Sequence, residues 1–199
     1  MKNRNNLSPK LEKFFMSEAL IIVDMQKDFC KGGSLEVPGA DEIVPILNKY
    51  IEKFLGKGLV IATRDWHPPN HISFEEKGGR WPKHCIQNSE GAEFHPELKL
   101  PENAIIISKG TNPKKEAYSG FEDTELEKIL KENGIGKVFI GGVATEYCVK
   151  ATCLDALERG FEVFLLEDAC KGVNAEDERK AIEEMVRKGV KLIRIEDMD

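Results

Sequence analysis

Short apolar runs alternate with amphipathic stretches along most of the chain. Six runs rich in β-branched and other apolar residues predict strands, and four stretches with apolar positions at helical spacing predict helices. The predicted strands are 19–24, 59–65, 104–108, 137–142, 162–168 and 191–195, and the predicted helices are 40–56, 123–133, 145–159 and 175–188. Parallel strands need crossover connections, and continuous apolar strands need cover on both faces. The pattern therefore predicts an α/β fold, a three-layer αβα sandwich with a central, mostly parallel six-stranded sheet.

Two segments depart from this alternation. Residues 64–103 are rich in proline, glycine and histidine and show no convincing periodicity. Long irregular segments in compact domains usually carry function. The first residues are basic and polar, without the apolar stretch or cleavage site of a secretion signal. We therefore expect a poorly ordered N-terminal appendage over residues 1–17 and one domain over residues 18–199.

Composition narrows the classes of partner. The chain has 199 residues and a net charge of −6, so it offers no general attraction for nucleic acid or anionic lipid. Its longest apolar runs, such as 19–23, are far shorter than the roughly 20 residues that span a bilayer. Five cysteines are an odd number and do not suggest a disulfide framework. We expect a cytoplasmic protein with a small-molecule partner, and neither nucleic acid nor membrane as a partner.

Reactive side chains follow four of the predicted strands. Asp24 ends the first strand, Asp65 ends the second, Lys109 follows the third and Cys148 lies just after the fourth. Each alone has an ordinary structural explanation: an aspartate caps or turns, a lysine is solvated and a cysteine packs. In open parallel sheets, however, ligands bind beyond the carboxyl ends of the strands. The set therefore predicts convergence at one edge of the sheet.

The chemistry of this set is that of a nucleophilic site. If Thr145 is the N-cap, Cys148 lies in the first helical turn, where backbone N–H groups and the helix dipole stabilise a thiolate. Asp24 could take the thiol proton and return it to a leaving amine, with Lys109 keeping that carboxylate ionised. The N–H groups around Ala144 and Cys148 could stabilise an oxyanion.

A second group of residues has the composition of a metal site. Asp65 and His67 are two apart, so in extended chain both side chains can face one ion. His84 could supply a third ligand, and His71 a fourth ligand or a neighbouring hydrogen-bond donor. Two histidines and one carboxylate leave open positions and suit zinc, iron or manganese. His95, followed by proline, is expected in a surface loop.

Five segments resemble one known family in their order along the chain. They are VDMQKDF, TRDWHPPNHISF, WPKHCIQNSEGAEFHPEL, SKGTNPKKEAYSGF and GGVATEYCVKAT. The chain resembles, over residues 19–195, the nicotinamidase/pyrazinamidase branch of the isochorismatase-like cysteine hydrolases.

The resemblance implies roles for these residues. It implies a catalytic triad of Asp24, Lys109 and Cys148, and an oxyanion hole made by the N–H groups of Ala144 and Cys148, with a cis peptide before Ala144. It also implies one divalent metal ion, zinc first and iron or manganese as alternatives. The ligands would be Asp65, His67 and His84, with His71 a ligand in some members only. Phe29 and Trp81 match the aromatic positions that hold the pyridine ring.

The resemblance implies that the protein is a metal-dependent amidohydrolase of NAD salvage. Nicotinamide and water would give nicotinate and ammonia through a thioester on Cys148, and pyrazinamide would be a second substrate. The oligomeric state is left open, since relatives range from monomers to larger assemblies, and a homo-oligomer is one of the options.

Other classes fit the residues less well. Isochorismatases generally lack the cysteine, and N-carbamoylsarcosine or ureidoacrylate amidohydrolases typically lack the D-x-H metal ligands. A ferrous oxygenase would use the two histidines and the carboxylate but would leave Cys148 and Lys109 without a task. A non-catalytic protein could retain the fold, because fold does not dictate function.

Overall fold

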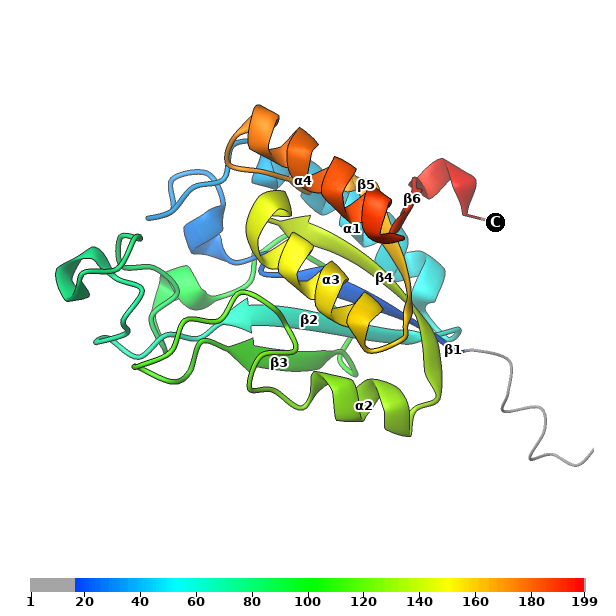
Figure 1. The fold of residues 1–199 in the computed structure, drawn as a ribbon, viewed down its shortest axis with the longest axis horizontal. Helices are drawn as coiled ribbons and strands as arrows, with labels where there is room; N and C mark the ends of the chain where they lie inside the picture. The colour runs from blue at the N-terminus through cyan, green and yellow to red at the C-terminus, as the bar shows by residue number, and fades with distance from the viewer. Residues whose placement is uncertain (1–16, 199) are drawn as a thin grey trace, which may run out of the picture.

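The computed structural model describes residues 17–198, and its centre is a six-stranded sheet in which every pair of neighbouring strands is parallel (Figure 1). The strand order is β3-β2-β1-β4-β5-β6. The strands are β1 Ser17–Val23, β2 Leu59–Asp65, β3 Ile105–Lys109, β4 Ile135–Val143, β5 Glu162–Lys171 and β6 Lys191–Ile193. The appendage expected over residues 1–17 lies outside the described residues except for Ser17, which begins β1.

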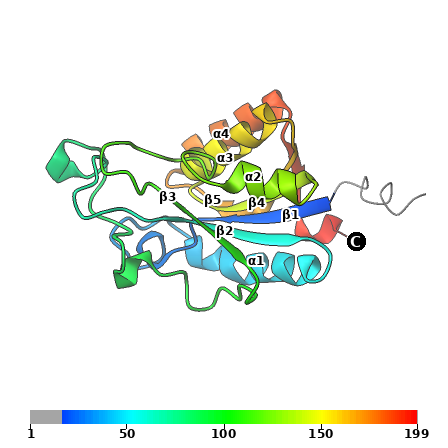
Figure 2. The same cartoon turned by 90° about the horizontal axis from the view of Figure 1, so that it is seen from below.

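Helices cover both faces of this sheet. They are α1 Ala40–Phe54, α2 Leu126–Glu132, α3 Lys150–Glu158 and α4 Ala175–Lys188. Figure 2 shows α1 on one face and α2, α3 and α4 on the other. The predicted three-layer αβα sandwich is therefore confirmed.

The central strand β1 shows why the sheet needs two helical layers. Its residues 19–23 are completely buried. Leu20 and Ile22 pack into the core that includes α1, whereas Ile21 and Val23 pack into the core on the opposite face. A strand with no solvent-facing side is apolar throughout, as the sequence of 19–23 is.

Local sequence signals set both ends of helix α4. In α4, the Asn174 side chain accepts hydrogen bonds from the N–H groups of Glu176 and Asp177, and Gly189 closes the helix in the left-handed region. Acidic residues occupy the first turn of α4 and basic residues the last, which complements the helix dipole.

The carboxyl ends of the strands open onto the long connections. Strand order reverses between β1 and β4, so the loops after these two strands diverge and leave a crevice, where ligands bind in folds of this type. The predicted irregular segment 64–103 begins with the end of β2 and otherwise holds only two short 3₁₀ turns, Glu75–Lys77 and Glu90–Ala92. It gathers beyond the carboxyl ends of the strands (Figure 1). Within residues 17–198, no helix is long and apolar enough to cross a membrane.

Candidate active site

The structure brings Asp24, Lys109 and Cys148 together at the carboxyl edge of the sheet. Asp24 follows β1, Lys109 is the last residue of β3, and Cys148 lies in a turn after β4. The Lys109 Nζ atom is 2.8 Å from Asp24 Oδ2 and 3.4 Å from Cys148 Sγ. All three residues are buried. An ammonium group therefore stands between a carboxylate and a thiol in a buried site.

Asp24 is held rigidly in this cluster. Its backbone has φ of 50°, in the left-handed region, and the Thr63 hydroxyl donates a 2.6 Å hydrogen bond to its Oδ1 atom. Burial raises the pKa of Asp24, and the charge of Lys109 offsets part of that effect. A carboxylate that resists ionisation is a stronger base once it is ionised, which suits a proton acceptor.

Cys148 is placed by a turn that the sequence did not predict. Thr145–Val149 is a single π-helical turn that runs into α3, and its N-cap is Ala144 rather than Thr145. Such turns are frequent at functional sites. Burial raises the pKa of the Cys148 thiol well above its usual value, and Lys109 opposes this only in part. A thiol in this setting needs a base to take its proton before the sulfur can attack, which is the role expected of Asp24.

Asp65, His67 and His84 form a second cluster that adjoins the first. His67 Nε2 lies 4.0 Å from Asp65 Oδ1, and His84 Nε2 lies 3.8 Å from Asp65 Oδ2. One donor atom from each residue lies within 4.8 Å of the other two, and all three residues are buried. These spacings place two imidazole nitrogens and a carboxylate oxygen around one point.

Hydrogen bonds fix the imidazole nitrogens in the form that binds a cation. Nδ1–H of His67 donates to the His84 carbonyl (3.2 Å), and Nδ1–H of His84 donates to the Pro82 carbonyl (2.7 Å). A carbonyl oxygen only accepts, so in the neutral form of each ring the Nε2 atom carries the lone pair. Burial lowers the pKa of His67 to about 4, and its buried Nε2 atom has no hydrogen-bond partner among the described residues. The donor set fits a divalent cation, and an unpaired buried nitrogen is otherwise costly.

Gly110 keeps space open beside this cluster. Its φ is +64°, and a Cβ atom at this position would lie 2.6 Å from His67 Nε2. A larger residue would therefore press on the lone pair that faces the cation position.

His71 lies beside the cluster with both ring nitrogens engaged. Its ring centroid is 4.2 Å from that of His67. Nε2–H donates to the Lys115 carbonyl (3.0 Å), and Nδ1 accepts from the Ser73 N–H (3.2 Å). The His71 ring therefore packs against the His67 ring, and neither of its own nitrogens is free to bind an ion.

Glu116 belongs to the same surroundings and was not singled out from the sequence. One of its carboxylate oxygens lies within 4.8 Å of donor atoms of His67 and His71, and burial raises its pKa. The signal was the one acidic residue in KKEAYSGF, which nothing in the sequence connects with the histidines about 45 positions earlier.

A mainly apolar cavity connects the two clusters with solvent. Its volume is small, about 40 Å³. Its lining residues are Phe29, Leu35, Val37, Asp65, Trp81, His84, Tyr118, Ala144, Tyr147, Cys148 and Val173. Cys148 and the predicted metal ligands Asp65 and His84 thus line the same small space, together with the predicted ring-binding residues Phe29 and Trp81.

Two tyrosines complete the aromatic wall and were missed from the sequence. Trp81 Nε1–H donates to the Tyr118 hydroxyl (3.0 Å), and the Trp81 and Tyr147 rings meet edge to face with centroids 5.0 Å apart. Tyr147 directly precedes Cys148, the predicted nucleophile, and this was the only sequence signal for it. The wall offers π-faces and edges to a flat aromatic ligand.

Ala144 stands at the junction of β4 and the π-helical turn. It is joined to Val143 by a cis peptide bond, as the resemblance implied, and it lines the same cavity as Cys148.

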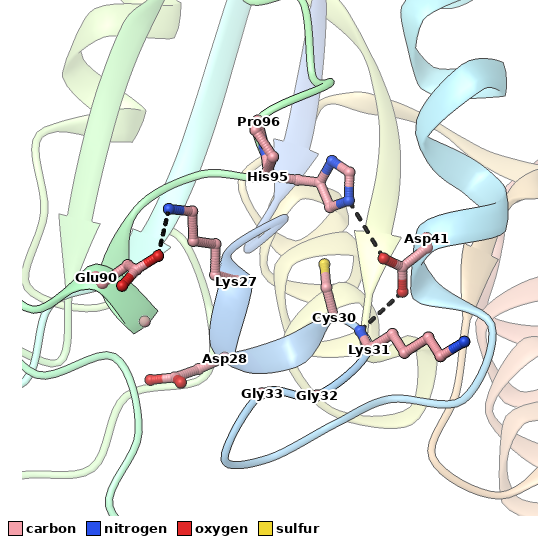
Figure 3. Close-up of a pocket in the computed structure, with 11 residues that line it drawn as sticks. Lys27, Asp28, Cys30, Lys31, Gly32, Gly33, Asp41, Glu90, His95 and Pro96 are labelled. Atoms are coloured by element: carbon pink, nitrogen blue, oxygen red, sulfur yellow. Dashed lines mark hydrogen bonds and ion pairs between the residues drawn. The ribbon is translucent and has the colours of Figure 1, made fainter.

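A second hollow, outside this site, holds Cys30, Asp41 and His95 (Figure 3). His95 is not simply a surface residue as expected, since its side chain is only 12% exposed and its Nε2 atom lies 3.2 Å from Asp41 Oδ1. His95 Nδ1 accepts from the Glu97 N–H (3.1 Å), so the ring proton is on Nε2. Burial raises the pKa of Cys30 to about 12. With a protonated nitrogen and a protonated thiol, this group lacks the free lone pairs of the first cluster.

The fold and the site define a hydrolase class, and comparison with known proteins gives the family. The isochorismatase domain family matches residues 18–197, and the chain belongs to this family. The nicotinamidase of Escherichia coli (strain K12) is 40% identical to the chain, and the alignment covers 91% of this chain and 96% of that protein.

Solved structures agree with this assignment. The chain resembles the pyrazinamidase of Pyrococcus horikoshii in complex with zinc, at 61% identity and a TM-score of 0.87, over 89% of this chain and 99% of that one. It also resembles PnC1 from L. infantum in complex with nicotinate, at 36% identity and a TM-score of 0.83, over 92% and 94% of the two chains.

Proposed function

We propose that the chain is a nicotinamidase, which hydrolyses nicotinamide to nicotinate and ammonia. The observation that carries this proposal is the shared cavity: the Cys148 thiol and the Asp65 and His84 donors face one small space walled by aromatic rings. A flat heteroaromatic carboxamide has a ring for the wall, a ring nitrogen for a cation and a carbonyl carbon for the thiol. The E. coli and P. horikoshii relatives are named for amidases of this kind.

Asp24 is the proton carrier in the proposed reaction. It takes the proton of the Cys148 thiol as the sulfur attacks the carboxamide carbon, and the carbonyl electrons move onto oxygen. The N–H groups of Ala144 and Cys148 are suited to receive that negative charge. The C–N bond then breaks, Asp24 gives its proton to the amine, and ammonia leaves a thioester on Cys148.

Water completes the cycle by the same route. Asp24 takes a proton from a water molecule as the water oxygen adds to the thioester carbon. The C–S bond then breaks, the sulfur recovers the proton from Asp24, and nicotinate leaves. Lys109 stays protonated throughout, because the Asp24 and Asp65 carboxylates outweigh burial and hold its pKa well above the usual value.

Asp65, His67 and His84 would hold a divalent cation next to this site. Bound there, the cation supplies an electron-pair acceptor for a ring nitrogen, which orients the carboxamide toward the thiol. Zinc is the first choice, because it favours imidazole and carboxylate donors and the P. horikoshii relative was solved in complex with it.

The remaining proposals concern substrate range and setting. Pyrazinamide presents a similar flat ring and carboxamide, so we propose it as a second substrate, and we place the reaction in NAD salvage. All five cysteines are free and buried, which suits the reducing cytoplasm where we propose that the protein acts.

Ammonia release decides among the candidate activities. The purified protein, loaded with zinc, should release ammonia from nicotinamide and from pyrazinamide. N-carbamoylsarcosine and isochorismate should remain unchanged, and oxygen should not be consumed. Release from N-carbamoylsarcosine but not from nicotinamide would overturn the proposal.

A further inference from the structure

The Gln26 side chain is clamped onto the backbone of Asp65. Gln26 Nε2–H donates to the Asp65 carbonyl (2.8 Å), and the Asp65 N–H donates to Gln26 Oε1 (2.8 Å). The second Nε2–H donates to the Ala92 carbonyl (2.9 Å). Gln26 is completely buried. Its side-chain amide uses both N–H donors and its oxygen acceptor to bind backbone groups of Asp65 and Ala92, which lie 39 and 66 positions further along the chain.

The backbone of Gln26 is also tied to the catalytic cluster. Its N–H donates to the carbonyl of Asp24 (2.7 Å). Gln26 therefore connects Asp24, the proposed proton carrier, with Asp65, which contacts both clusters. Gln26 itself does not line the cavity.

Asp65 needs such a constraint because its two oxygens serve different partners. Oδ1 lies 2.5 Å from Lys109 Nζ, and Oδ2 lies 3.8 Å from His84 Nε2. A small rotation of the Asp65 backbone would move the carboxylate away from one partner while bringing it toward the other. Residues behind metal ligands typically change metal affinity by about 10- to 100-fold when they are replaced.

We propose that Gln26 is a positioning residue that sets the placement of the Asp65 carboxylate, and thereby both the cation affinity of the site and the alignment of Lys109. The inference rests on the proposed function only for its kinetic readout. A primary amide is required, because it presents an acceptor to the Asp65 N–H and two donors to the carbonyls of Asp65 and Ala92. A carboxylate of the same shape would place an acceptor against those carbonyls.

The test compares zinc retention and turnover in Gln26→Glu and Gln26→Met. Each zinc-loaded protein is titrated with a chelating dye at fixed pH, and kcat and KM for nicotinamide are measured separately. We expect the zinc dissociation constant to rise by about tenfold or more in both variants. We also expect kcat to fall, because Lys109 loses a fixed partner. Should one variant fail to fold, the other provides the measurement.

Asn48 offers a matched control elsewhere in the molecule. Its side-chain amide makes the same kind of clamp on backbone, since Nδ2–H donates to the Glu97 carbonyl (2.9 Å) and Oδ1 accepts from the Lys99 N–H (2.8 Å). Asn48→Asp should leave the zinc dissociation constant within about twofold of the wild-type value.

The outcomes separate this inference from the proposed function. Folded Gln26 variants that hold zinc and turn over like the wild type would overturn the positioning role. An equal loss of zinc in Asn48→Asp would also overturn it, because the effect would then be general loosening. Zinc retention needs no substrate, so the role of Gln26 in zinc binding can stand even if nicotinamide proves not to be hydrolysed.

Discussion

The Lys109 Nζ atom lies 2.5 Å from Asp65 Oδ1, so the cluster of Asp24, Lys109 and Cys148 and the cluster of Asp65, His67 and His84 share an ion pair. Burial by itself raises the pKa of Asp65, but the charge of Lys109 and the nearby His84 ring hold it below its usual range. Asp65 is therefore ionised whenever the site is intact. A change of charge in one cluster therefore shifts the pKa values of the groups in the other.

Removal of the Lys109 ammonium should be severe. Lys109→Ala leaves the Asp24 and Asp65 carboxylates buried without their cation, and losing one partner of a buried ion pair costs about 3–5 kcal/mol. We expect kcat for nicotinamide to fall by about 100-fold or more, with a smaller change in KM. Denaturant unfolding and steady-state kinetics measure both effects.

The half-exposed Lys137–Glu18 pair provides the comparison for that loss. Lys137→Ala should cost less than about 1 kcal/mol and leave turnover intact. An unchanged kcat in Lys109→Ala would remove this lysine from the catalytic set.

Replacing Cys148 should abolish turnover but still allow a ligand to bind in the cavity. Cys148→Ala removes the only sulfur that lines the cavity, so no thioester can form and kcat should fall by roughly 10⁴-fold or more. Nicotinate should still bind, as isothermal titration can measure. Cys153 is fully buried outside the cavity, and Cys153→Ala should keep its turnover. Comparable kcat in Cys148→Ala would end the assignment.

Gly110 tests the cation position by steric means. A methyl group at Gly110 would meet His67 Nε2 at 2.6 Å, so we expect Gly110→Ala to bind zinc about tenfold or more weakly. Gly134→Ala is the matched control, because Gly134 has nearly the same φ, +65°, but no atom near its Cβ position. Both variants carry about 1–2 kcal/mol of backbone strain. Equal zinc contents in the two purified proteins would contradict the prediction.

Removal of the metal should act mainly on substrate binding. The proposed ligands Asp65 and His84 line the cavity, whereas Asp24, the proposed proton carrier, does not line it and has a carboxylate oxygen within 4.8 Å of the Cys148 sulfur. After chelation we expect KM for nicotinamide to rise by about tenfold, which corresponds to about 1.4 kcal/mol, with a smaller change in kcat. Added zinc should restore the initial KM. Full activity in protein shown by elemental analysis to be metal-free would refute a role for the ion.

The Tyr118 hydroxyl should contribute to holding the ring-binding wall. Tyr118→Phe leaves Trp81 Nε1–H without its acceptor, at a cost of about 1 kcal/mol. We expect KM to rise by about fivefold while kcat changes little. Tyr50→Phe is the control, since the Tyr50 hydroxyl bonds to Asp168 away from the cavity and its loss should affect stability only. A KM increase of the same size in both variants would count against a role specific to Tyr118.

Periodicity predicted the elements well where the signal is local. The predicted strand 59–65 and helix 175–188 coincide with β2 and α4, and both have clear limits: Asp65 ends the apolar run, and Asn174 and Gly189 enclose α4. The helix predicted over 123–133 is shorter, Leu126–Glu132, because Asp123 has φ of 54° and the chain before the helix forms turns. Local turn geometry of this kind leaves no periodic trace.

The αβα architecture and the set of reactive residues could be predicted from the sequence, because apolar periodicity and the position of polar residues at strand ends are local properties. The same pattern placed Asp24, Asp65, Lys109 and Cys148 at one edge of a parallel sheet. The sequence could not show that Asp65 is shared between the clusters, that both ring nitrogens of His71 are engaged, or that Gln26, Tyr118 and Tyr147 lie around the site. These features depend on burial and on side-chain contacts between segments tens of residues apart, which no local pattern encodes.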